Sequence, residues 1–543
     1  MNFLAFPRIS QYNKRMEKRE SGAVSEGVNP DEMAALKARV AELEILVKYY
    51  EERLRLSKHK QFGASSEQSG HNPDQLSIFN EAEVTADANV PEPELIEIEK
   101  HYRKRTRLTT DKLPEDLPVE VVEHDLPESE KICPECGGEL HVMGRDSRRE
   151  LVIVPAQVKI REHIRLVYAC RDCEKDACGV PMVKSPLAEP VIKGSFASPE
   201  AIAQIMTQKF VMGSPLYRQE QELQRNGIKL SRQTMSNWLL RATEDWLEPI
   251  YGAMREILLS REVLHADETT LQVLHEPDKP AQSKSYMWLY RTSGDTSEAI
   301  VLYDYQPDRK TKRPAEFLKG FQGYLHTDGY EAYHSLGSGI TVVGCWAHAR
   351  RKFDEALKAM AEKDREGSHA LRGKQYCDQL FMLERKFADM TSRERYKKRL
   401  EFSKPLLEEL FQWADSVSVL PKSATGQARH YLLSQKKYLE RYLLDGRLEI
   451  SNNRAERSIK PFVIDRKNFL FANTSRGAKA SAVMFSLIET AKENGLDPYR
   501  YLTHVFEKAP NSDVRNSIDA LQELLPWFVP DYIKSVREVC PAV

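Results

Sequence analysis

The sequence has no long hydrophobic run and almost no net charge. Its apolar runs, such as AIVLY from Ala299, are far shorter than the roughly 20 residues that a membrane helix needs. The amino-terminal residues lack the basic, apolar and small-residue regions of a secretory signal. The 80 Lys and Arg residues nearly balance the 81 Asp and Glu residues, so total charge does not indicate a nucleic-acid partner. We therefore expect a cytoplasmic protein with no membrane segment, whose basic surfaces are local.

The composition is that of a chain with several folded domains. Hydrophobic residues make up 41% and charged residues 30% of 543 residues, enough apolar material to bury sizeable cores. At roughly 150 residues per domain, three or four units are expected.

An apolar heptad seam runs along residues 31–60. Its apolar residues recur three and four positions apart, with Val at two a positions and Leu at two d positions, which favours parallel dimers. The seam comprises Met33, Leu36, Val40, Leu43, Val47, Tyr50 and Leu54. The pattern predicts a coiled coil that joins two or more copies of the chain. An amphipathic helix that docks on its own protein is the alternative.

Cysteine is scarce outside one segment, since five of the eight cysteines fall within residues 133–178. Two CxxC pairs, Cys133 with Cys136 and Cys170 with Cys173, flank a stretch of strand-like alternation. In a cytosolic chain such pairs predict a zinc ribbon, because each pair turns two thiolates toward one ion. Four reduced, buried cysteines are the alternative. Since a ribbon is too small to fold on its own core, the zinc is expected to be structural, within a nucleic-acid-binding module.

Helical patterns fill residues 198–256, with Ser214 and Ser231 as expected N-caps. The middle two segments are joined by a short turn and resemble a helix-turn-helix. The second helix of the pair carries Arg232 and Gln233 on its leading turn, where such helices contact bases. We expect this region to read DNA. A plain helical spacer is the alternative.

The hydrophobic period changes to that of strands near residue 262. Three consecutive strands are predicted at 262–274, 284–292 and 298–306. A helix, a strand at 323–328, a short helix, a strand at 340–345 and a helix from Trp346 follow. This βββαβαβα order is the layout of a ribonuclease-H-like domain, in which three antiparallel strands lead into parallel βα units. The analogy concerns the fold, so function must come from the site.

Two acids stand in these apolar strands. Asp267 lies at the centre of the first strand, and Asp328 lies at the end of the fourth. A carboxylate in such surroundings is costly unless a cation or hydrogen bonds offset its desolvation. Each aspartate alone could be a turn or cap residue. Together they predict a site for a hard divalent ion such as Mg²⁺, which carboxylates and waters hold.

A third carboxylate is expected in the basic segment 454–476, which holds six Lys or Arg and two acids. Glu456 would lie on a helix that is capped by Asn452 or Asn453 and ended by Pro461. An acid in a phosphate-attracting surface fits a metal ligand beside a DNA backbone. A Glu456 that only pairs with a basic neighbour is the alternative.

The sequence resembles transposases of the insertion sequence 66 family from the heptad helix to the C-terminus. The stretches that carry the resemblance are LRLSKHKQFGASSE, LPEDLPVEVVEHDLPESEKICPECGGEL, LHADET, HTDGYEAY, GCWAHARRKF and DGRLEISNNRAERSIKPFVIDRKNFLFA. The resemblance implies a DDE triad of Asp267, Asp328 and Glu456 that holds two Mg²⁺ or Mn²⁺ ions. It also implies an enzyme that binds the ends of its element, cleaves DNA with water and joins the 3′ hydroxyl ends to target DNA.

The resemblance extends to accessory residues and partners. Cys345 and His348 match a CxxH element of transposases with a helical insertion, although His348 as a structural histidine is the alternative. Phosphates would be positioned by Arg350, Arg351, Arg454, Arg457, Lys460, Arg466, Lys467 and Arg476. The expected partners are double-stranded DNA at the nucleoid, further copies of the chain through the coil, and small accessory proteins. Two other functions stay open, namely a DNA-binding regulator that does not cut and a nuclease acting on RNA hybrids or junctions.

We therefore expect a multidomain α+β and α/β protein. A charged helical pattern separates the second acid from the third, and an insertion there is tolerated if its ends lie close together. The expected segments are an N-terminal extension (1–30), a coiled-coil helix (31–60), a flexible linker (61–112), a zinc-ribbon DNA-binding domain (113–185), a helix-turn-helix-like region (186–258), a ribonuclease-H-like catalytic core (259–350), a helical insertion (351–446), the second part of the core with the third acid (447–492) and a C-terminal helical tail (493–543).

Overall fold

The computed structural model describes residues 30–62, 158–164, 166–169, 182–184, 186–469 and 472–534. The chain divides into two compact units, residues 1–67 with 188–543, and residues 68–187. In the second unit β1 (Val167–Ala169) pairs antiparallel with β2 (Met182–Lys184). The cysteines predicted to bind zinc, Cys133, Cys136, Cys170 and Cys173, lie outside the described residues.

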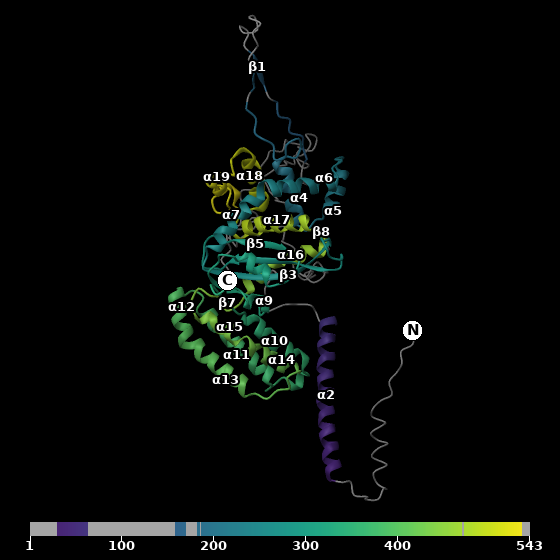
Figure 1. Cartoon of the computed structure of the whole chain (residues 1–543), viewed down its shortest axis with the longest axis vertical. Helices are drawn as coiled ribbons and strands as arrows, with labels where there is room; N and C mark the ends of the chain where they lie inside the picture. Colours follow the sequence, from purple (N-terminus) through teal and green to yellow (C-terminus); the bar gives the residue numbers. More distant parts are fainter. Residues whose placement is uncertain are drawn as a thin grey trace, which may run out of the picture. The chain divides into compact units, whose positions relative to one another are not determined.

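A mixed sheet forms the centre of the larger unit (Figure 1). Its strands are β3 (Val263–His275), β4 (Lys284–Thr292), β5 (Val301–Gln306), β6 (Gly323–His326), β7 (Ile340–Val343) and β8 (Ala472–Thr474). The spatial order is β5-β4-β3-β6-β7, and β8 pairs with β3. The first three strands are antiparallel, whereas β3, β6 and β7 run parallel. The short helices α8 (Lys312–Phe317) and α9 (Glu331–His334) connect the later strands, so the element order is the one that the sequence pattern predicts.

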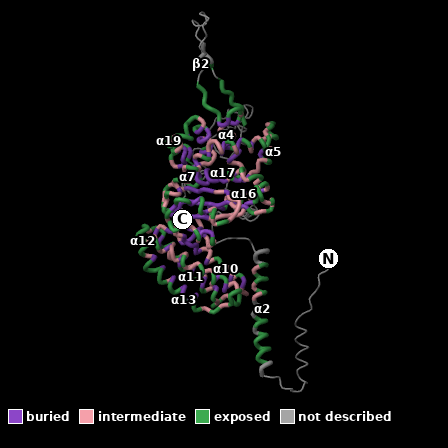
Figure 2. Tube along the Cα trace, in the orientation of Figure 1, coloured by how far each residue is buried: buried purple, intermediate pink, exposed green. Residues whose placement is uncertain are grey.

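Helix α17 (Ser475–Glu493) covers the β5 edge of the sheet. The Val301 and Tyr303 amides donate to the side-chain hydroxyls of Thr490 and Ser486, at 3.0 and 2.8 Å. An edge strand otherwise exposes unpaired amides that can recruit another chain. Figure 2 shows that α17 and the strands beneath it are largely buried. The sheet is therefore closed on this side by a helix that comes almost 190 residues later in the sequence.

Within residues 186–262, four helices and a π-helical turn lead into the sheet. They are α4 (Pro199–Phe210), α5 (Leu216–Arg225), α6 (Arg232–Ala242), the turn Thr243–Leu247, and α7 (Glu248–Leu259). Ser231 caps α6, because its hydroxyl accepts from the Thr234 amide at 3.1 Å. The prediction for Ser214 is wrong. The Ser214 amide donates to Gln208 O at 2.8 Å, which holds Ser214 in the preceding turn, and Pro215 takes the cap position instead.

The C-terminal part adds α16 (Asn453–Phe469), α18 (Pro498–Lys508) and α19 (Ile518–Gln522), with 3₁₀ turns at Ala509–Asn511 and Asp531–Ile533. The predicted end of α16 at Pro461 is wrong, since the helix continues for two further turns. A proline in a helix interior costs about 3 kcal/mol. Here Phe462, the next residue, is buried against the Tyr303 and Phe485 rings, and this packing offsets the lost backbone bond.

A helical subdomain lies between β7 and α16. It consists of α10 (Trp346–Ala359), α11 (His369–Lys386), α12 (Ser392–Lys398), α13 (Lys404–Ser416), α14 (Ala424–Ser434) and α15 (Lys436–Leu439), with 3₁₀ turns at Glu362–Asp364 and Glu440–Leu443 and a π-helical turn at Arg399–Ser403. Trp346, Phe353 and Phe411 help to form a second hydrophobic core within it. The ends of the subdomain meet, because the Trp346 amide donates to Ile450 O at 3.1 Å.

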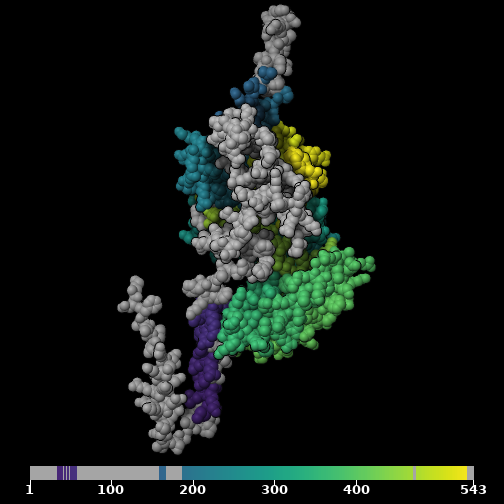
Figure 3. Space-filling model, turned by 180° about the vertical axis from the view of Figure 1, so that it is seen from behind, coloured from purple at the N-terminus to yellow at the C-terminus, as the bar shows by residue number. Residues whose placement is uncertain are grey.

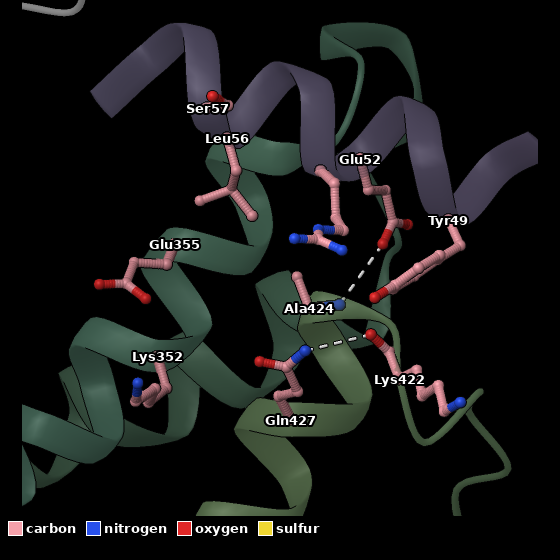
Figure 4. A pocket seen from close by; sticks show the side chains of 10 residues that line it. Tyr49, Glu52, Leu56, Ser57, Lys352, Glu355, Lys422, Ala424 and Gln427 are labelled. Carbon is pink, nitrogen blue, oxygen red and sulfur yellow. Dashed lines mark hydrogen bonds between the residues drawn. The ribbon is translucent and has the colours of Figure 1, made fainter. Parts of the chain in front are cut away.

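Helix α2 (Pro30–Phe62) carries the predicted heptad seam. The seam side chains are exposed, from 44% for Met33 to 59% for Leu36. A different face of α2, with Tyr49, Glu52 and Leu56, lies against α10 and α14 of the helical subdomain (Figures 3 and 4). The alternative considered for this helix, docking on its own chain, is therefore observed for one face, whereas the coiled coil with another copy through the exposed seam stays a prediction.

Glu52 makes the polar contact of this docking. Its carboxylate accepts from the Ala424 amide at 3.4 Å, at the first residue of α14, as Figure 4 shows. Negative charge is favourable at a helix N-terminus, where backbone amides lack partners.

Among the helices of the described residues, none has the length and apolar character needed to cross a bilayer.

Candidate active site

Asp267 lies on β3, and Asp328 lies just beyond the end of β6, the parallel strand beside β3. The β3–β6 register pairs His265 with His326, an offset of 61 residues, and the two aspartates are separated by the same 61 positions. Each aspartate follows its paired histidine by two residues, so both carboxylates leave the sheet at the same level. Asp328 follows the end of β6, and its Oδ1 accepts from the Tyr330 amide at 2.9 Å. The structure thus brings together two acids that the sequence keeps far apart.

Glu456 reaches this region from the first turn of α16. Its Oε2 lies 3.2 Å from Arg351 Nη2, and its Oε1 lies 3.6 Å from His348 Nδ1. Both residues belong to α10, so the Glu456 side chain faces the first helix of the helical subdomain.

The pKa of Asp267 shows that the acids interact. Burial raises this pKa well above its ordinary value, and the nearby charges of Glu268, Asp328 and, more weakly, Glu456 raise it further. Asp267 accepts a hydrogen bond from the Glu268 amide at 2.8 Å, which only partly offsets these effects. Ionised carboxylates crowded in this way favour a bound cation.

Asn452 ties the elements of the site together. Its Nδ2 donates to Ala266 O at 2.8 Å, beside Asp267, and its Oδ1 lies 2.9 Å from His265 Nδ1. Its backbone amide donates to Cys345 Sγ at 3.1 Å. Asn452 immediately precedes α16 and is only 1% exposed. One buried amide side chain therefore sets the start of the Glu456 helix against the Asp267 strand.

Two buried histidines form the floor beneath the aspartates. His265 and His326 stack with ring centroids 4.4 Å apart. Burial lowers the pKa of His265 to about 3 and that of His326 well below its ordinary value, so both rings are neutral. The Glu449 amide donates to His326 Nε2 at 3.2 Å, which places the ring proton on Nδ1. Neither ring was predicted to belong to the site, although His326 stands where the family resemblance would lead one to expect a small residue, and strand alternation places both rings on the same face as the aspartates.

Glu268 is a fourth acid that sequence analysis missed. Its side chain is 2% exposed and pairs with Arg309. The Tyr333 hydroxyl donates to its Oε2 at 2.5 Å. Burial raises the pKa of Glu268, and the charge of Asp328 adds to this effect. Because Glu268 has a cation and a hydroxyl as partners, it differs from Asp267, which has one backbone hydrogen bond. An acid next to Asp267 in a strand was the available signal.

The basic residues predicted to contact phosphate fall into two groups. Arg457, Lys460 and Lys467 are exposed along α16. The others already contact protein groups. Arg454 donates to Glu449 at 2.6 Å, Arg466 binds the Thr269 and Thr270 hydroxyls, Arg476 chelates Glu244, Arg350 donates to Asp378, and Arg351 donates to Glu456. The exposed group is the one that can meet a phosphate backbone without breaking an internal contact.

Arg232 and Gln233 are exposed on the first turn of α6. The Arg232 guanidinium lies over the Tyr217 ring of α5, 5.8 Å from its centroid. The α5–α6 pair therefore presents polar side chains at a helix start, in the arrangement that a helix-turn-helix uses.

The CxxH residues adjoin the third acid. Cys345 immediately precedes α10 and is 1% exposed, and its pKa is raised to about 12, first by burial and then by the charge of Glu456. His348 lies one turn along α10. Burial lowers its pKa, and Glu456 opposes that effect.

Replacing Asp267 should stabilise the metal-free protein. Because the folded state raises the pKa of Asp267, its ionisation costs stability as the pH rises above about 3.9, the ordinary aspartate value. In chelator, Asp267→Asn should raise the melting temperature at pH 8 by about 2–4 °C, with little effect near pH 4. Asp308→Asn is the control of opposite sign, because Arg313 lowers the pKa of Asp308 to about 2. A fall in melting temperature for Asp267→Asn at pH 8 would contradict this account.

Removing the Asn452 side chain should destabilise the core. Asn452→Ala leaves the Ala266 carbonyl and the His265 ring without their buried partner, at a cost of about 1–3 kcal/mol. Asn453→Ala, at the half-buried neighbouring position, is the matched control and should cost less than about 0.5 kcal/mol. Thermal and urea unfolding measure both. Equal effects of the two variants would show that Asn452 has no special role.

The chain matches four models of one transposase family. The model described as "Transposase IS66 family" matches residues 194–480, which contain the three acids. The "zinc-finger binding domain of transposase IS66" matches residues 130–174, and the "IS66 C-terminal element" matches residues 486–527. A model described as "Transposase C of IS166 homeodomain" matches residues 49–122.

The chain is also similar to uncharacterised proteins of Sinorhizobium fredii. It is 32% identical to y4qI over 432 residues and 31% identical to y4hP over 434 residues, in each case over 76% of both chains. It is 31% identical to y4jD over 430 residues, which cover 76% of this chain and 81% of y4jD. From these matches and from the family model that spans the core, the chain belongs to the IS66 family of transposases.

Proposed function

We propose that this transposase is a DDE enzyme that binds the ends of its insertion sequence, cleaves DNA with water and joins the 3′ hydroxyl ends to target DNA. The observation that best supports the proposal is that the nearby charges of Asp328 and Glu456 act on the buried Asp267, beside the parallel strands β3 and β6. The order and direction of the strands support a ribonuclease-H-like core for this site. Acids that hold two metal ions can catalyse both the cleavage and the joining of DNA at one site, since both reactions are phosphoryl transfers.

The three carboxylates fit a pair of Mg²⁺ or Mn²⁺ ions. Oxygen ligands suit these hard cations, and the raised pKa of Asp267 marks a place where positive charge relieves crowding of acids. Glu268 fits less well, since Arg309 and Tyr333 occupy its oxygens. Bound magnesium supplies charge that stabilises the negative charge developing on the attacked phosphate.

The protein side chains around the acids position the DNA. Arg457, Lys460 and Lys467 lie exposed on the helix that carries Glu456, so they can hold phosphates beside the acids. Arg454 and Arg466 support this helix from within, through Glu449 and the β3 threonines. We assign base reading to Arg232, Gln233 and the ribbon, and the ribbon requires one structural zinc ion at Cys133, Cys136, Cys170 and Cys173. The protein would act at the nucleoid, with small accessory proteins as further partners.

Strand transfer with DNA of the element ends tests the proposal. With Mg²⁺ the wild-type chain should cut at the ends and join them to target DNA. Asp267→Asn, Asp328→Asn and Glu456→Gln should each reduce product to background while DNA binding persists, because each removes a carboxylate and keeps the shape of the side chain. Asp531→Asn, an exposed acid near the C-terminus, should retain activity.

Two results would overturn the proposal. A wild-type chain that binds the ends but never cuts them is a DNA-binding regulator. A wild-type chain that cuts generic RNA–DNA hybrids as fast as element ends is a nuclease of the same fold.

We further propose that α2 joins two copies through its heptad seam. Val and Leu at a and d positions favour a parallel dimer, and the whole seam is exposed in the single chain. Since α2 docks on the helical subdomain by another face, that docking leaves the seam free for the second copy.

Charges placed on the seam should separate the copies. Val40→Asp with Val47→Asp should convert a dimer to a monomer, because two buried a positions in each helix become charged. Ala34→Asp with Ala38→Asp adds the same charge to exposed positions off the seam and should leave the dimer intact. Light scattering after size-exclusion chromatography gives the mass. The proposal fails if the wild type is a monomer, or if the seam variant keeps the wild-type mass.

A further inference from the structure

A thiol, an imidazole and a carboxylate converge beside the predicted catalytic site. Cys345 Sγ, a ring nitrogen of His348 and an oxygen of Glu456 all lie within 4.8 Å of one another. Cys345 immediately precedes α10 and His348 follows one turn later, so the two share a face of the helix. Glu456 comes from α16, whose start Asn452 holds against Cys345 by the 3.1 Å contact of its amide with Sγ.

The spacing of these atoms suits one tetrahedral ion. His348 Nδ1 lies 3.6 Å from Glu456 Oε1, slightly too far for a hydrogen bond. Two ligands that each lie about 2.0–2.2 Å from a tetrahedral zinc ion stand roughly 3.3–3.6 Å apart. Cys345 Sγ lies within 4.8 Å of both atoms, so all three are within reach of one ion.

The polar atoms of the cluster are in want of a partner. His348 Nδ1 and Glu456 Oε1 are both buried and make no hydrogen bond within the part of the chain that the structure describes. A buried polar atom without a partner costs about 1–3 kcal/mol. A cation between them would satisfy both atoms at once. The backbone amide of Asn452, which donates to Sγ, would act as the outer contact that orients a metal-bound sulfur.

The ligand types select the ion. Thiolate and imidazole favour zinc over magnesium, whereas carboxylate accepts either ion. Three protein ligands leave a fourth position open to water or substrate, as in zinc sites that are not purely structural. We propose that Cys345, His348 and Oε1 of Glu456 form a zinc site, distinct from the zinc ribbon, that fastens the third acid to α10, while Oε2 can exchange Arg351 for the catalytic ion. Zinc binding can be measured without DNA. This proposal can therefore be tested independently of the transposition reaction.

Zinc content of the full-length chain tests the site. After dialysis against trace zinc, the wild type should hold about two ions per chain, one in the ribbon and one here. Cys345→Ala should hold about one fewer than the wild type. Cys377→Ala is the matched control, because Cys377 is an equally buried thiol on α11, outside the cluster, and should keep the wild-type content. The proposal is overturned if Cys345→Ala and Cys377→Ala hold the same zinc as the wild type.

A second variant covers the case in which Cys345→Ala does not fold. His348 is 24% exposed, so His348→Gln should keep the fold, which circular dichroism checks. Its zinc affinity at this site should fall by more than the roughly 10–100-fold that loss of an outer contact costs, because a direct ligand is lost. Unchanged affinity in folded His348→Gln would overturn the proposal. With zinc replaced by cobalt, the wild type and His348→Gln should also differ in the visible absorption that reports the ligand set.

Discussion

The buried amide of Asn452 is the contact on which the geometry of the site depends. The side chain of Asn452 bonds to Ala266 and His265 of β3, and its backbone amide donates to Cys345, so this residue joins β3, α10 and α16, three elements separated by about 80 to 190 residues. Each bond lies next to, or within a few residues of, an acid or its partner. A buried residue whose side chain and backbone amide together make three hydrogen bonds permits few alternative arrangements, because any shift would leave a polar group without a partner and away from water. The acids can therefore be crowded together although their mutual repulsion opposes it.

The helical subdomain is part of the site as well as an insertion. Its chain leaves the sheet after β7 and returns before α16, and its ends meet at the Trp346–Ile450 hydrogen bond. Closing a loop of this length costs little more than closing a short one, so a large subdomain can be accommodated without disturbing the acids. Its first helix, α10, places His348 and Arg351 beside Glu456 and also contacts α2, and Lys352 and Glu355 of the same helix line the pocket next to α2. One helix thus links the third acid to the segment that carries the heptad seam.

Much of the core was predictable from the sequence, because alternating or continuous apolar residues indicate a strand within a short segment. The 61-residue spacing of Asp267 and Asp328 was visible too, but only the parallel register of β3 and β6 gives it meaning. Features set by distant packing were not predictable. Pro461 predicted the end of a helix, but α16 continues beyond it because the buried Phe462 side chain stabilises the helix there. Two further contacts join segments that are far apart in the sequence, so neither can be predicted from one segment alone. They are the stacked pair His265–His326 and the ion pair Glu268–Arg309.

The most direct measurement is a crystal structure of the full-length chain with element-end DNA and Mn²⁺, whose anomalous signal locates the ions. The account predicts manganese bound by carboxylate oxygens of Asp267, Asp328 and Glu456, at the roughly 2.0–2.2 Å typical of such small divalent ions. It also predicts that Glu268 stays with Arg309 and Tyr333. Manganese held by Glu268 instead, with Glu456 paired only with Arg351, would contradict it.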